Sequence, residues 1–136
     1  MSLEAIFSEL RQRFKNEFNE FEDHSPGLDR AEYLRWASDA KLSEAALCNA
    51  IAIHLAAGFL RGDLPFMYCD HIVNGLYSRM IERNELPEPF WSVFLAFDAG
   101  EDTDPKDPSA DTVEKYTRPQ LIEVMSRYSQ QRFLQE

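Results

Sequence analysis

Hydrophobic side chains recur along most of the chain at steps of three or four residues, which places them on one face of an α-helix. The pattern predicts helices over residues 3–22, 30–38, 44–60, 64–83, 90–97 and 118–133. No linker and no internal repeat divides these stretches. The sequence therefore predicts an all-α fold, a single domain over residues 1–136 built as a bundle of about six helices.

Residues that favour helix ends flank most of these stretches. Oxygen-bearing side chains that can accept the unpaired N–H groups of a first helical turn stand at Ser2, Asp29, Ser43, Asp63 and Thr117. Gly62 and Gly100 fit helix C-termini. Residues 44–60 are apolar on nearly every face, so we expect that helix at the centre of the bundle.

The run at residues 90–97 is ambiguous in type. Its aromatic and β-branched side chains are equally typical of a strand. A strand needs a partner strand, and no second strand-like run occurs in the sequence. The sequence therefore favours a helix at residues 90–97.

The chain is strongly acidic, with 14 Lys and Arg against 24 Asp and Glu and a formal net charge of −10. This charge argues against nucleic acid, which needs a basic face, and against anionic membranes. The first residues lack a secretory pattern, and no apolar run reaches the roughly 20 residues of a membrane span. Cys48 and Cys69 lie in apolar helical patterns, which suits reduced, buried thiols. We expect a cytoplasmic protein.

Known catalytic motifs are absent: there is no Gly-rich phosphate loop, no G-x-S-x-G and no H-E-x-x-H. Cys69, Asp70 and His71 are adjacent on one helix and point about 100° apart, so they cannot share one ion. We expect no metal, no cofactor and no catalytic residue. One alternative stays open, a small enzyme or ligand-binding protein with a polar pocket of His54, Asp70, His71 and Asn74. The same side chains also suit a hydrogen-bond cluster between helices.

Acidic residues concentrate near the C-terminal end of the chain. Residues 98–114 hold seven acids and one base, Lys106, and the prolines at 105 and 108 predict a loop at about residues 101–117. A loop of this kind keeps a protein soluble. It would also steer a basic protein partner and exclude wrong ones. The candidate partner-binding residues are Asp98, Glu101, Asp102, Asp104, Asp107 and Asp111.

Aromatic residues stand close to this acidic segment in the sequence. Trp91, Phe94 and Tyr116 would favour a docking surface if they are exposed beside it, whereas a buried position would make them core residues. The chain has ten phenylalanines, which leaves a homodimer through an aromatic face open as well.

Residues 90–101 (FWSVFLAFDAGE) and 113–119 (VEKYTRP) resemble small acidic bacterial proteins of uncharacterised type. Some of these look like the immunity proteins of contact-dependent inhibition and other polymorphic toxin systems. The resemblance extends from residue 66 onward and carries no catalytic residue with it. It implies a non-enzymatic cytoplasmic protein that blocks a toxin, often a basic nuclease, by tight binding. The leading hypothesis is therefore an immunity protein that neutralises a basic toxin domain through its acidic surface.

Overall fold

The computed structural model describes residues 2–17 and 28–135, and within these ranges the all-α prediction is confirmed. The elements are α1 (Leu3–Glu17), α2 (Arg30–Ala40), α3 (Glu44–Arg61), α4 (Phe66–Glu82), α5 (Phe90–Asp98), the π-helical turn η1 (Val113–Thr117) and α6 (Arg118–Gln135). The ambiguous run at residues 90–97 is helical, as expected. The predicted continuation of the first helix over residues 18–22 lies outside the described residues.

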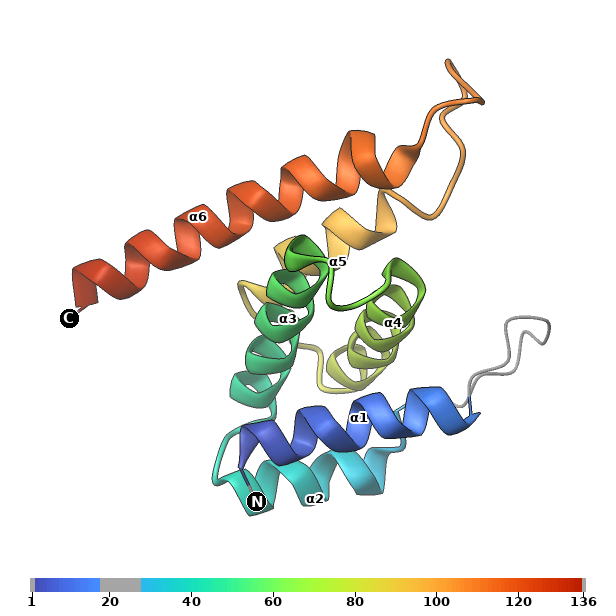
Figure 1. Cartoon of the computed structure of the whole chain (residues 1–136). Coiled ribbons are helices and arrows are strands. Elements are labelled where there is room, and N and C mark those ends of the chain that lie inside the picture. Colours follow the sequence, from blue (N-terminus) through green and yellow to red (C-terminus); the bar gives the residue numbers. More distant parts are fainter. Residues whose placement is uncertain (1, 18–27, 136) are drawn as a thin grey trace.

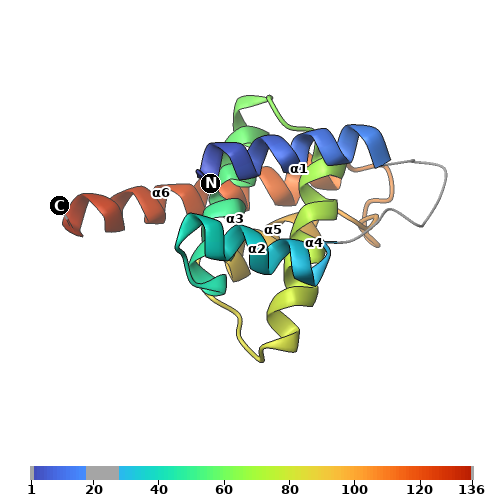
Figure 2. The same ribbon diagram turned by 90° about the horizontal axis from the view of Figure 1, so that it is seen from below.

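The helices are arranged from one end of the molecule to the other. An antiparallel pair, α1 and α2, lies at one end, α3, α4 and α5 form the middle, and α6 crosses the opposite end (Figures 1 and 2). Polar contacts join the pair: Arg13 and Arg35 form ion pairs with Glu32 and Glu9. The Trp36 indole also donates to Glu9 Oε2 at 2.6 Å. These polar contacts join α1 to α2, and each of the two helices also packs against α3.

Helix α3 is the central element, as its apolar sequence predicts. It packs against α1, α2, α4, α5 and α6, and Leu47 and Leu55 on it are fully buried. Ser43 caps its start, since the Oγ accepts from Ala46 N at 3.0 Å, and Gly62 ends it with a left-handed φ of 82°. Sequence cues for this helix therefore agree with its environment.

Two of the predicted helix starts are wrong. Asp63 pairs with Arg61, and the N-cap position of α4 is Pro65. Thr117 does not begin the last helix, because the chain is already helical from residue 113. Thr117 is instead fully buried, and its Oγ1 donates to Ala96 O at 2.7 Å. The hydroxyl that was expected to cap a helix joins η1 to α5.

Gly100 follows α5 as predicted, but for a different reason. The helix ends with right-handed backbone at Ala99, so no left-handed residue is needed there. A Cβ on Gly100 would lie 2.4 Å from Thr117 Oγ1 and 3.2 Å from a ring carbon of Phe66. Glycine is required by this close approach, which brings η1 against the end of α5.

The apolar positions 121, 122, 125, 128 and 133 predict the buried stripe of α6, and the structure corrects this set. Leu121 and Val124 are buried, whereas Ile122 is 54% exposed. Residues 121, 124, 125 and 128 have the spacing of one α-helical face, and Ile122 points about 100° away from Leu121. Met125 and Tyr128, which were expected to be buried, are half-buried. The side chain of Phe133 lies outside the described part of the chain.

The two cysteines are confirmed as buried free thiols. Burial raises the pKa of each thiol, most of all by removing water from the thiolate. Cys69 Sγ lies 3.6 Å from Leu55 O, at the contact between α4 and α3. Both side chains therefore act as small core residues.

Because Thr117 fastens η1 to α5, Thr117→Val is expected to lower the free energy of unfolding by about 1–3 kcal/mol, as a buried carbonyl loses its donor while shape is kept. Urea denaturation followed by circular dichroism measures this. Thr117→Ser, which retains the hydroxyl, is the matched control and should lose less. Equal losses in the two variants would show that the hydroxyl contributes nothing.

Candidate functional site

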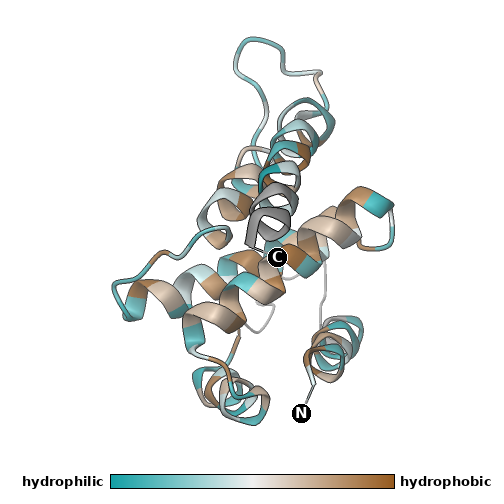
Figure 3. Cartoon of the chain, turned by 90° about the vertical axis from the view of Figure 1, so that its left-hand side faces the viewer, coloured by the Kyte–Doolittle hydropathy of each residue, from teal (hydrophilic) through white to brown (hydrophobic). Residues whose placement is uncertain are grey.

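The acidic loop, residues 99–112, connects α5 to η1 and protrudes where these elements meet (Figure 1). It is hydrophilic along most of its length (Figure 3). Five of the six predicted partner-binding carboxylates are exposed, one at the end of α5 and four on the loop: Asp98, Glu101, Asp102, Asp107 and Asp111. Their charges are thus open to solvent on one part of the molecule.

Asp104 is the exception, and its predicted role needs correction. Its side chain is only 6% exposed. Oδ2 accepts from Lys115 Nζ at 2.8 Å and from the Tyr116 hydroxyl at 2.6 Å, while Oδ1 accepts from Lys106 N at 2.9 Å. The bonds from Lys115, Tyr116 and Lys106 hold the pKa of Asp104 well below its usual range. A carboxylate with all its donors inside the chain shapes the loop and offers nothing to a partner.

Further bonds tie the acidic loop at both ends. Thr112 Oγ1 donates to Gly100 O at 3.1 Å, across the base of the loop. Asp111 Oδ1 accepts from Glu114 N at 3.2 Å, so this exposed acid also caps the first turn of η1. Asp104 fastens the middle of the loop. The segment is therefore a tethered loop, and its outward carboxylates have defined positions.

The structure brings together two groups of residues that the sequence singled out separately. Asn74 of α4 donates through Nδ2 to Glu101 Oε1 at 3.0 Å and to Asp70 O at 2.8 Å. Asp70 Oδ1 is buried with no hydrogen-bond partner among the described residues. Burial, then the hydrogen bond with Glu101, then the charges of Glu101 and Asp98 raise the pKa of Asp70 to about 8. A polar group at the α4–α5 contact thus holds a proton near neutral pH.

Three aromatic rings continue the same α4–α5 contact. Tyr77 and Phe94 have ring centroids 4.7 Å apart, Trp91 and Phe94 5.4 Å, and Tyr77 and Trp91 6.2 Å, with all three rings near parallel. All three are half-buried. Tyr77 lies one turn beyond Asn74, and Phe94 lies one turn before Asp98. This aromatic stack therefore adjoins the carboxylates along one contact between two helices.

The alternative polar pocket is not assembled as one cavity. His54 stacks on Phe7, with centroids 3.9 Å apart, and lines a hollow of about 330 Å³ between α1, α3 and α6. Burial, with a smaller contribution from the Arg61 charge, lowers the pKa of His54. The wall of that hollow includes none of the other three candidates, Asp70, His71 and Asn74, which stand on α4. His54 thus behaves as a packed, uncharged ring.

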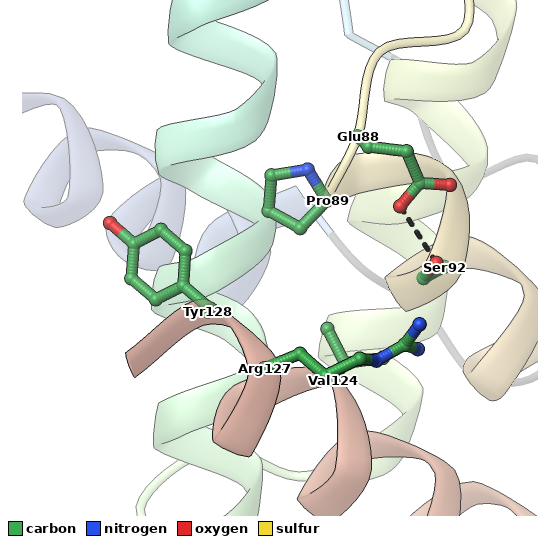
Figure 4. A pocket seen from close by; sticks show the side chains of 6 residues that line it. All are labelled: Glu88, Pro89, Ser92, Val124, Arg127 and Tyr128. Atoms are coloured by element: carbon green, nitrogen blue, oxygen red, sulfur yellow. Dashed lines mark hydrogen bonds between the residues drawn. The ribbon is translucent and has the colours of Figure 1, made fainter. Parts of the chain in front are cut away.

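A second hollow, of about 250 Å³, lies between the start of α5 and α6 (Figure 4). Its wall is formed by Glu88, Pro89, Ser92, Val124, Arg127 and Tyr128. Ser92 Oγ donates to Glu88 Oε2 at 2.7 Å, so the hydroxyl already has a partner inside the chain. This wall includes no cysteine or histidine that would act as a nucleophile or base. The sequence analysis missed these residues, because nothing in their spacing links two segments that only folding brings together.

The described residues contain neither a metal-binding cluster nor a single helix suited to span a membrane. In residues 2–17 and 28–135, no group of three or more His, Cys, Asp or Glu is placed to hold a metal ion. No single helix in those ranges combines the length and the hydropathy needed to cross a membrane. Comparison with protein-family models, with curated proteins and with solved structures finds no match. The site is therefore interpreted from its own geometry.

The raised pKa of Asp70 makes folding depend on pH. Between about pH 4 and pH 8 the folded chain holds a proton that the unfolded chain has released, so this group's contribution to the free energy of unfolding falls as pH rises. Asp70→Asn, which stays neutral, is expected to flatten this dependence. At about pH 8.5 the free energy of unfolding of the variant should exceed that of wild type by about 1 kcal/mol, a small value because solvent partly screens the half-exposed charge of Asp70. Urea denaturation across this pH range measures it. Asp102→Asn should leave the slope unchanged, and an unchanged slope in Asp70→Asn would contradict the assignment.

The tether at Asp104 is tested by hydrogen exchange. Asp104→Asn loses the charge that draws Lys115, so the loop amides, Lys106 N among them, should exchange on the order of tenfold faster. Asp102→Asn, a matched change on the same loop, should leave these rates near the wild-type values. Equal exchange rates in the wild type and the Asp104 variant would mean that the loop does not depend on this carboxylate.

Proposed function

We propose that this protein is a non-enzymatic interaction protein, an immunity-type inhibitor that binds and neutralises a basic toxin domain through its acidic surface. The exposed acids Asp98, Glu101, Asp102, Asp107 and Asp111 pair with the Lys and Arg side chains that such a toxin directs at nucleic acid. Occupying those cations blocks the toxin's own substrate. The chain does this by binding alone and needs no cofactor or metal.

One observation carries the proposal: the acidic loop is tethered by its own buried carboxylate. A loop that serves only solubility needs net charge but no fixed shape. Here Asp104 is held by Lys115 and Tyr116, and Thr112 closes the base of the loop onto Gly100. Like charges placed close together repel one another, and the chain accepts this at one part of its surface. Preorganised charges of one sign favour rapid and selective capture of the opposite sign.

The competing proposal, a small enzyme or ligand-binding protein with one pocket of four polar residues, has no specific observation in its favour. His54 is stacked in a different hollow from the one that Asp70, His71 and Asn74 would line. The Asn74 side chain donates to the backbone carbonyl of Asp70 and to Glu101 at the start of the acidic loop. The arrangement fits a polar cluster between helices, at the edge of the acidic surface.

The first test is the neighbouring gene, which this proposal expects to encode a large secreted protein with a C-terminal toxin domain. Co-expression is expected to rescue growth of cells that produce the toxin domain. Asp102→Asn combined with Asp107→Asn should weaken binding of the purified domain by about three- to tenfold, mainly through slower association, because exposed pairs contribute little each. Raising the salt concentration should also weaken wild-type binding through slower association, because salt screens the exposed charges.

A matched pair of neutralised acids controls for net charge. Glu4→Gln with Asp39→Asn removes two negative charges from α1 and α2, at the other end of the molecule (Figure 1). This variant should bind as tightly as wild type. Failure of the wild-type chain to bind or protect would reject the role of inhibitor. Equal weakening by both charge pairs would reject the acidic loop as the interface.

A further inference from the structure

We infer that the α4–α5 contact binds an arginine side chain of the basic partner, with its guanidinium against the aromatic stack of Tyr77, Phe94 and Trp91 and its charge toward Asp98 and Glu101; this rests on the proposed function. The acidic loop attracts many basic surfaces equally well. An aromatic stack beside exposed acids adds a requirement for shape. Selectivity for the partner therefore depends on this arginine side chain.

Three features place a cation site here. The rings are near parallel, which suits a planar group laid against them. Asp98 is exposed one helical turn after Phe94, and the exposed Glu101 accepts from Asn74, which lies one turn before Tyr77. Leu95, on the neighbouring face of α5, is 43% exposed and adds apolar area beside the stack. An apolar centre with a charged edge is the usual anatomy of a protein–protein interface.

The stack also differs from other aromatic rings of this chain. Arg11 lies 5.0 Å from the centroid of Tyr68, Lys115 lies 5.3 Å from that of Tyr116, and Arg118 lies 4.9 Å from that of Phe59. Each of those rings has a cation from its own chain. Among the described residues, no cation–π contact forms with Tyr77, Phe94 or Trp91. The exposed part of the stack is therefore open to a cation from a partner, with the exposed Asp98 one helical turn after Phe94.

Arginine fits this site better than lysine does. Guanidinium is planar, weakly hydrated and able to stack while its N–H groups donate sideways to carboxylates. The ammonium of lysine is a hydrated point charge without a stacking face. Three half-buried rings beside two carboxylates supply both kinds of contact at once. We therefore expect discrimination between the two bases, which a purely electrostatic surface would not produce.

The test uses three capped peptides in which glycine alternates with arginine, with lysine, or with citrulline, the neutral isostere of arginine. Binding to the ¹⁵N-labelled full chain is followed by the two indole N–H signals, because only Trp36 and Trp91 contribute. The arginine peptide should shift the Trp91 signal and leave that of buried Trp36 in place. It should bind about fivefold more tightly than the lysine peptide, and the citrulline peptide should not bind. Equal binding of the arginine and lysine peptides, or of the citrulline peptide, would overturn the inference.

Substitutions test whether the arginine peptide binds at the aromatic stack. Trp91→Gln should weaken the arginine peptide about fivefold and Trp91→Phe much less, while Leu34→Gln on α2, at a position 39% exposed, should have no effect. Asp98→Asn with Glu101→Gln leaves every ring in place and should weaken the same peptide, which covers the case that Trp91→Gln fails to fold. Full binding by either the Trp91→Gln or the Asp98→Asn/Glu101→Gln chain would overturn the inference.

Failure of this inference is distinguishable from failure of the proposed function. If toxin binding depends on Asp102 and Asp107 but not on Trp91, the inhibitor role stands and the arginine site is wrong. If the arginine peptide binds at Trp91 but no toxin domain is neutralised, the arginine site stands and the inhibitor role is wrong.

Discussion

The close contact between η1 and the end of α5 is the constraint on which the C-terminal half of the structure depends. The Thr117 hydroxyl occupies the position where a side chain on Gly100 would lie, and it donates a hydrogen bond to Ala96 O. Helix α6 follows directly from η1 and crosses the end of the molecule opposite α1 and α2 (Figure 1). It also fixes both ends of the acidic loop, because the loop begins at α5 and ends at η1. A small residue and one buried hydrogen bond thus place the most highly charged segment of the chain.

The charged segment and the helices beneath it are coupled electrostatically. Asp104 lies inside a set of donors that favours its charged form, and it stabilises the loop at neutral pH. Asp70 is in the opposite situation, since it is half-buried near two other carboxylates and retains its proton to about pH 8. Asp104 therefore stabilises the acidic loop in its charged form. Asp70 stays protonated to about pH 8 and so adds no negative charge to the acidic surface. A basic partner would relieve this repulsion, so the same arrangement that costs stability in the free chain favours binding.

The stack of Tyr77, Phe94 and Trp91 gives the acidic surface an apolar component. Charge alone governs encounter rates, whereas affinity depends on groups that lose water on binding. Tyr77 and Phe94 pack against the core, and Trp91 stacks on Phe94 with its ring half-buried. Rigid aromatic side chains lose little conformational entropy when a partner docks, which is a further reason that they suit an interface.

The sequence by itself determined the helices. Apolar spacing of three and four predicted most of them, and the lack of a partner strand decided for a helix at residues 90–97. Ser2, Asp29 and Ser43 cap helix starts as expected, because these bonds form within a few residues of chain. The central place of α3 followed from an apolar surface all around the helix, which only complete burial accommodates. The acidic loop was also predicted, since charge density and prolines are local properties of the chain, but its expected range of about 101–117 is too long because residues 113–117 are helical.

Tertiary structure decided everything that depends on two segments meeting. Thr117 has cap chemistry, yet its hydroxyl donates to the carbonyl of Ala96 on α5, 21 residues earlier in the chain. Asp104 is identical in sequence terms to the exposed acids around it, and only its contact with Lys115 and Tyr116 separates it from them. Helix packing likewise separates His54 from Asp70, His71 and Asn74. It also brings Asn74 of α4 next to Glu101, which follows α5. Periodicity gives the face of a helix on which a residue lies, but the packing of helices decides what that face meets.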